Sequence, residues 1–174
     1  MVFDVQKGDF FMSKTTKKIV RAGLIAGIYV VLSLITFPVA SGGIQFRISE
    51  ALTILPLFFI ESIPGLFVGC LLSNLITGCL ILDVVLGSIV TLIASILTFL
   101  VGKVIKKSWL SIILGGFFPV ILNALFLPLI WILAYGVIEY VYYLQVIFLL
   151  ISQSVSVYAI GTPLYYAIKS KMIK

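Results

Sequence analysis

The sequence predicts an all-α integral membrane protein with six transmembrane helices and both termini in the cytoplasm. Of its 174 residues, 62% are hydrophobic and only 10% are charged, whereas an average soluble domain has about 25% charged residues. The apolar residues form long segments, and the basic residues gather at the termini and at one connection. So apolar a chain cannot present a water-soluble surface, and its hydrophobicity also excludes a disordered protein.

The first two predicted segments differ in length. Residues 19–39 follow a basic stretch and are long enough to cross a bilayer, which takes about 20 residues. Residues 48–60 contain Glu50 near their start and are followed by Glu61, so that only 13 residues are available. We therefore expect the second segment to be tilted, capped by loops or partly re-entrant.

Four further segments have the length and apolar character of spans. The third covers residues 64–82, and the fourth, at 83–101, opens on Asp83, which complements the positive end of a helix. The fifth covers 109–135 and the sixth 144–168. The chain is thus divided into an N-terminal segment (1–18), a six-helix membrane domain (19–168) and a basic tail (169–174).

The distribution of positive charge supports this topology. With the N-terminus inside, eleven of the 12 Lys and Arg residues fall on the cytoplasmic side, as the positive-inside rule requires, and Arg47 is the exception. The net charge of +6 is then explained by membrane orientation, and we expect no nucleic-acid partner. The eleven residues are Lys7, Lys14, Lys17, Lys18, Arg21, Lys103, Lys106, Lys107, Lys169, Lys171 and Lys174.

Motifs of catalysis and metal binding are missing from the sequence. It contains no His, and Cys70 and Cys79 are nine residues apart, which would place them on opposite faces of one helix. It has no phosphate-binding loop and no Gly-x-Ser-x-Gly elbow. We therefore expect neither an enzyme nor a cofactor. An intramembrane enzyme that uses only carboxylates, or a secondary transporter with inverted repeats, would be the rival interpretations.

Four charged residues lie toward the extracytoplasmic ends of their segments: Arg47, Glu50, Asp83 and Glu139. Charge within a membrane protein is costly and therefore needs a reason. These residues could be solvated at the interface, or Arg47 and Glu50 could pair across one helical turn. Alternatively, they point into a cavity and bind a polar ligand.

Amides and aromatic residues extend this set. Asn123, Leu127, Trp131 and Tyr135 recur every four residues and share one helix face. A mid-span amide such as Asn123 or Asn74 needs a hydrogen-bond partner on another helix or on a ligand, whereas the outer aromatics also fit an interface belt. Gln145, Ser152, Gln153 and Ser156 in the sixth segment fit helix packing as well as ligand contact.

Small residues mark the first segment as a packing helix. Ala22 and Ala26 form one pair at four-residue spacing, and Gly23 and Gly27 form another. Such pairs let a second helix approach closely within lipid. The approaching helix could belong to this chain or to a partner.

Three stretches of the sequence resemble the queuosine-precursor transporter family, whose members are substrate-binding S components of energy-coupling factor transporters. They are Ile-Gln-Phe-Arg-Ile-Ser-Glu-Ala-Leu-Thr-Ile-Leu-Pro at 44–56, Ile-Pro-Gly-Leu-Phe-Val-Gly-Cys-Leu-Leu-Ser-Asn at 63–74 and Asp-Val-Val-Leu-Gly-Ser at 83–88. The similarity covers about residues 13–170. The pair Ala22 and Ala26 also resembles the motif with which S components dock onto their coupling subunit.

The resemblance implies a six-helix protein of the bacterial plasma membrane that binds a micronutrient from outside. It further implies delivery through a transmembrane coupling subunit and two ATPases. The substrates associated with the family are queuosine precursors such as 7-aminomethyl-7-deazaguanine or queuine. Another micronutrient, or a stand-alone transporter, would be the alternative.

A deazaguanine suits the polar residues of this chain. Its adjacent N–H donors can be accepted by one carboxylate, and its aminomethyl group is cationic. We expect Glu50 or Asp83 to accept the guanine-like edge and another of the three outer acids to pair with the ammonium. The other candidate contacts are Gln45, Arg47, Asn74 and Asn123 for polar groups and Phe46 or Trp131 for stacking.

Overall fold

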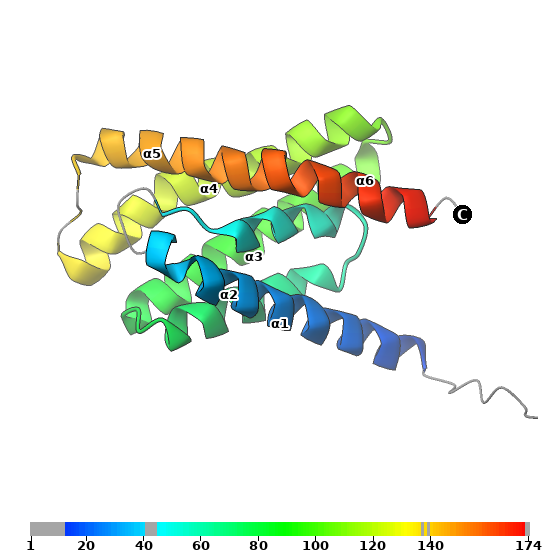
Figure 1. Ribbon diagram of the computed structural model, residues 1–174, viewed down its shortest axis with the longest axis horizontal. Helices are drawn as coiled ribbons and strands as arrows, with labels where there is room; N and C mark the ends of the chain where they lie inside the picture. Colours follow the sequence, from blue (N-terminus) through cyan, green and yellow to red (C-terminus); the bar gives the residue numbers. More distant parts are fainter. Residues whose placement is uncertain (1–12, 41–44, 137, 139, 173–174) are drawn as a thin grey trace, which may run out of the picture.

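The computed structural model describes residues 13–40, 45–136, 138 and 140–172, and the described part is helical (Figure 1). The last three elements follow one another without a break and form one long rod (Figure 1). The elements are α1 (Lys14–Ala40), the 3₁₀-helix η1 (Ile48–Leu57), α2 (Ser62–Ile76), α3 (Ile81–Val104), α4 (Ser108–Tyr135), α5 (Tyr142–Ser154), the π-helical turn η2 (Val155–Ile160) and α6 (Gly161–Met172).

The six predicted segments occur in their predicted order, but within the described residues only four helical segments are long and apolar enough to cross a membrane. η1 has 10 residues and α2 has 15. The predicted third segment extended to residue 82, whereas α2 ends at Ile76 because a turn follows it, with Gly78 in the left-handed conformation at φ 77°. The four long segments are Lys14–Pro38, Ile81–Val104, Ser108–Tyr135 and Tyr142–Met172.

The helices alternate in direction, so that the start of α1 and the end of α6 lie at the same end of the bundle (Figure 1). The α3–α4 connection lies at this end too, where Lys169 of α6 donates a hydrogen bond to Ser108 of α4. Arg21 and Glu61 form an ion pair of 2.6 Å there, between α1 and the start of α2. The described basic residues other than Arg47 therefore lie at or near one end, which we call the basic end.

The short helix η1 occupies the centre of the bundle. Its residues Ser49–Pro56 are all buried, and it contacts α1, α2, α3, α4, η2 and α6. Gly102 of α3 permits this close approach, since a Cβ there would lie 2.6 Å from the carbonyl oxygen of Leu57. A helix too short to span is tolerated at membrane depth only when protein surrounds it, and η1 meets that condition.

The two faces of α1 have different surroundings. A Cβ added at Gly65 of α2 would lie 2.8 Å from the carbonyl oxygen of Ala22, and Ala26 is buried. By contrast, a Cβ added at Gly23 or Gly27 would meet no atom within 4 Å. The Ala22 and Ala26 pair therefore packs against α2 of the same chain, and the Gly23 and Gly27 pair is exposed.

This packing predicts different effects of alanine at two glycines of the bundle. Gly65→Ala forces α1 and α2 apart, and we expect it to lower the free energy of unfolding by about 1–3 kcal/mol, as overpacking does. Gly23→Ala is the matched control, because it meets open space and raises helix propensity. Thermal unfolding in detergent compares the two. Equal melting temperatures for the two variants would contradict the close α1–α2 contact.

Candidate binding site

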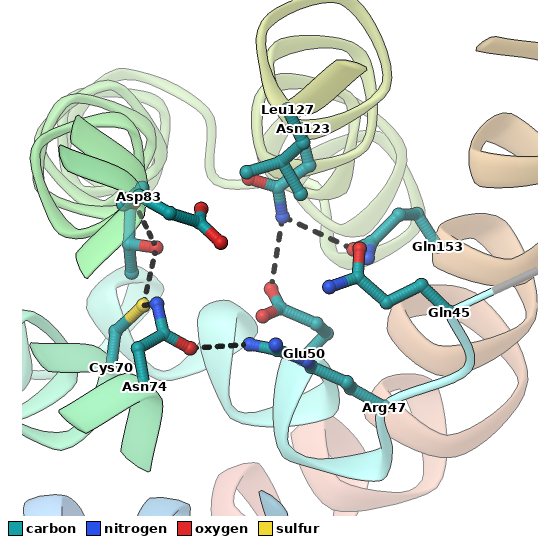
Figure 2. Close-up of a pocket in the computed structure, with 11 residues that line it drawn as sticks. Gln45, Arg47, Glu50, Cys70, Asn74, Asp83, Asn123, Leu127 and Gln153 are labelled. Atoms are coloured by element: carbon teal, nitrogen blue, oxygen red, sulfur yellow. Dashed lines mark hydrogen bonds between the residues drawn. The ribbon is translucent and has the colours of Figure 1, made fainter. Parts of the chain in front are cut away.

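A polar cavity lies inside the bundle, toward the end opposite the basic end. Its volume is about 20 Å³, which is close to the room that one water molecule requires. η1, α2, α3, α4 and α5 all contribute to its walls, together with the segment that precedes η1 (Figure 2). The lining residues are Gln45, Arg47, Glu50, Cys70, Asn74, Asp83, Gly87, Thr91, Asn123, Leu127 and Gln153.

Glu50 lies at the centre of the site, in the first turn of η1, and is only 4% exposed. The Tyr29 hydroxyl of α1 donates to its Oε1 at 2.6 Å. The Asn123 amide of α4 donates to its Oε2 at 3.1 Å. A buried carboxylate needs such donors to offset the loss of hydration. Two helices distant in sequence thereby fix both oxygens of Glu50.

Asn123 connects this carboxylate to α5. Its Nδ2 also donates to Oε1 of Gln153 at 3.2 Å, so the mid-span amide has a partner on each side. Asn123 and Leu127, two of the four residues predicted to share one face of the fifth segment, both line the cavity. Gln153, for which the sequence favoured helix packing over ligand contact, also lines the cavity.

Arg47 donates to Oδ1 of Asn74 at 2.9 Å. It lies within ion-pair distance of neither Glu50 nor Asp83; the ion pair found among the described residues is that of Arg21 and Glu61. The alternative in which Arg47 and Glu50 pair across one helical turn is wrong, because Arg47 precedes η1 in an extended conformation, with φ −122°. The guanidinium is thereby directed toward α2.

Asp83 lies in the first turn of α3 and is 7% exposed. The Tyr135 hydroxyl at the end of α4 donates to its Oδ2 at 3.1 Å and accepts a hydrogen bond from the Leu80 backbone N–H at 3.2 Å. The side chains of Trp131 and Cys79 also interact with this carboxylate. Asp83 thus joins α3 to the aromatic end of α4.

Gln45 shows two unusual features at once. Its φ of 40° lies in the left-handed region, which a residue with a side chain rarely adopts. It is 8% exposed, and its Oε1 has no hydrogen-bond partner among the described residues. Figure 2 shows its amide pointing into the cavity. Backbone strain and an unsatisfied buried acceptor are both typical of functional sites.

Six of the nine residues expected to contact a ligand line the cavity: Gln45, Arg47, Glu50, Asn74, Asp83 and Asn123. Phe46 is half-buried and is not among the lining residues. Trp131 is half-buried as well and lies beside Asp83 without lining the cavity. Glu139 lies outside the described residues.

Tyr29, whose hydroxyl donates to Glu50, was not among the residues predicted from the sequence. A tyrosine in the middle of an apolar span is itself a signal, because its hydroxyl needs a partner when buried. Cys70, Gly87 and Thr91 were also missed as lining residues. The Cys70 sulfur of α2 accepts a hydrogen bond from the Thr91 hydroxyl of α3 at 3.4 Å, and such a contact between two helices cannot be deduced from spacing along the chain. The same holds for the place of Gly87 in the cavity wall.

Comparison with known proteins places this architecture in a family. At a stringent threshold, no curated protein and no solved structure matches the chain. The family model described as QueT transporter matches residues 19–170, which include every lining residue of the cavity and Tyr29. The helices long enough to span a bilayer agree with a multi-pass membrane transporter. The chain belongs to the QueT transporter family.

Proposed function

We propose that this protein is the substrate-binding S component of an energy-coupling factor importer in a bacterial plasma membrane. It captures a queuosine precursor, 7-aminomethyl-7-deazaguanine or queuine, and delivers it with an ATP-driven coupling module. The observation that carries the proposal is the enclosed cavity around Glu50, in which carboxylates, a guanidinium and amides converge within an otherwise apolar bundle. The family match supports transport as the role of that cavity.

The cavity offers complementary groups for each part of a deazaguanine. A carboxylate accepts the adjacent ring N–H and amino donors, and Arg47 or an amide N–H donates to the ring carbonyl. Gln45 contributes a carbonyl oxygen whose hydrogen-bonding capacity is unused within the described residues. A purely hydrophobic vitamin would leave this oxygen unpaired, which costs about 1–3 kcal/mol for a buried group.

The size of the cavity has a consequence for binding. About 20 Å³ accommodates one water but no bicyclic ring system. A deazaguanine therefore requires the walls to separate. Residues 45–47, which carry two lining side chains, have no regular secondary structure and include the strained Gln45. Movement of this wall breaks the hydrogen bond from Arg47 to Asn74 and the one from the Glu50 N–H to the Arg47 carbonyl oxygen, but it leaves the α-helices intact.

The distribution of charge supports capture from outside the cell. The described basic residues other than Arg47 lie at or near the basic end, which the positive-inside rule assigns to the cytoplasm. The cavity lies toward the opposite end, where α2 ends, α3 begins and α4 ends (Figure 1). A substrate would therefore enter from the extracytoplasmic side.

Energy for transport would come from partner subunits, since the sequence contains no phosphate-binding loop. The exposed glycines of α1 provide a docking position for the transmembrane coupling subunit. They lie in an apolar groove of about 370 Å³, and small residues permit close helix approach within lipid. The groove is lined by Gly23, Leu24, Gly27, Ile28, Val31 and Leu32.

The small molecule that co-purifies with the protein tests the substrate. We expect mass spectrometry of the protein, purified from cells in mild detergent, to identify a 7-deazaguanine, because the cavity matches its donors and acceptors. Biotin, riboflavin or thiamine would refute the queuosine precursor but preserve the role of an S component. Product formed from a lipid or peptide by the purified chain alone would favour an enzyme instead.

Substitution of the central carboxylate tests the site. Glu50→Gln should weaken the binding of 7-aminomethyl-7-deazaguanine by about 10- to 100-fold, since hydrogen bonds to a charged group contribute about 1.5–3 kcal/mol. Glu61→Gln is the matched control, because Glu61 pairs with Arg21 far from the cavity. Isothermal titration calorimetry in detergent measures both. Unchanged affinity in Glu50→Gln would place the ligand elsewhere.

A bulky residue in the α1 groove tests docking separately from binding. Gly27→Leu should abolish co-purification with the coupling subunit and ligand uptake, while ligand affinity stays within about 2-fold, because the glycine is exposed and remote from the cavity lining. Ala167→Leu, at an exposed position of α6, is the control. Uptake in Gly27→Leu at the level of the control would exclude this groove as the docking site.

A further inference from the structure

The two carboxylates of the cavity have different environments. Figure 2 shows Glu50 close to Arg47 and Asn123, with Gln45 and Gln153 on the same side, whereas Asp83 lies across the cavity. Amides, a guanidinium and the Tyr29 hydroxyl therefore surround Glu50. Tyr135 and Trp131 accompany Asp83, and Asn74 lies on the same side of the cavity.

Glu50 is suited to binding the edge of a flat ring that carries two adjacent N–H donors. Its two oxygens are held by separate donors, Tyr29 at 2.6 Å and Asn123 at 3.1 Å, which fixes the plane of the carboxylate. A fixed plane favours bidentate pairing with two adjacent N–H donors. The unsatisfied Oε1 of Gln45 on the same side can accept a further donor.

Asp83 is suited to a positive charge. Tyr135 donates to its Oδ2, and its Oδ1 lies beside Gly87, which is one turn along α3 and also lines the cavity. A Cβ at Gly87 would stand 3.6 Å from Oδ1 and 3.5 Å from Nδ2 of Asn74, in the space that leads to the carboxylate.

The charges of the cavity favour the same ligand. Arg47 donates to Asn74, and neither Glu50 nor Asp83 has an ion-pair partner among the described residues. The lining thus contains two carboxylates and one guanidinium. A ligand with one positive charge balances this set, and it offsets part of the cost of burying the second carboxylate.

We propose that Asp83 is the residue that selects a cationic substituent on the ligand, while Glu50 binds the neutral hydrogen-bonding edge. This assignment rests on the proposed function, because it takes the ligand to be a deazaguanine. It goes further in dividing the two roles between the carboxylates. It makes a positive charge on the ligand the feature by which a cationic deazaguanine is distinguished from a neutral one.

The experiment compares two ligands that differ by one charge. The probes are 7-aminomethyl-7-deazaguanine and its neutral analogue 7-hydroxymethyl-7-deazaguanine, measured by titration calorimetry in detergent. The wild type should prefer the aminomethyl compound by about 10-fold or more, since a charge-assisted hydrogen bond is about twice as strong as a neutral one. Asp83→Asn should reduce that preference to within about 3-fold, and Asp83→Glu should retain it.

The other variants separate the two roles. Glu50→Gln should weaken both ligands and leave their ratio unchanged, and the control Glu61→Gln should alter neither. Asp83→Ser is prepared beside Asp83→Asn, so that a folding defect in one leaves the other as the readout. The preference of the wild type for the aminomethyl compound is measured independently of the variants.

Four outcomes would overturn the proposal. If both ligands bind the wild type with equal affinity, or if the preference survives in Asp83→Asn and Asp83→Ser, the assignment of Asp83 is wrong and the proposed function stands. If the preference is lost in Glu50→Gln instead, the two roles are reversed. If neither ligand binds the wild type, the proposed function fails together with the assignment.

Discussion

Burial of the Glu50 carboxylate is the constraint to which much of the structure responds. It lies in the middle of an apolar bundle, so each of its oxygens needs a donor from within the protein. Tyr29 supplies one from α1 and Asn123 supplies the other from α4. These two bonds tie the first and fourth α-helices to η1 and so fix the geometry of the cavity.

The position of Glu50 depends in turn on η1. This helix is too short to span a bilayer, and the elements around it enclose it completely from Ser49 to Pro56. Because polar backbone at that depth must be shielded from lipid, the long helices serve as a wall around a short central element. This wall places Arg47 and Glu50 in the bundle interior, where charged residues of a membrane protein are retained.

Part of this structure could be predicted because a membrane restricts both the polar residues and the length of the segments that cross it. Glu50, Asp83 and Asn123 were recognised from the sequence because polar groups in an apolar segment are costly, and the short second segment was recognised by its length. Tyr29 was not, although the hydroxyl of a buried tyrosine in a span also needs a partner. Likewise, Ala22 and Ala26 pack within the chain because Gly65 of α2 lets the two helices approach closely. Such a contact depends on the tertiary structure and cannot be predicted from α1 alone.

The helix α1 connects the two proposed sites of the protein. One face packs on α2 and carries Tyr29 to the cavity, while the other exposes Gly23 and Gly27. A displacement of α1 by a docked partner would therefore act on the hydrogen bond to Glu50. The structure of the protein bound to 7-aminomethyl-7-deazaguanine tests the central claim most directly. We predict the ring inside the cavity, with its donors about 3 Å from the Glu50 carboxylate; a ligand located outside this cavity would contradict the account.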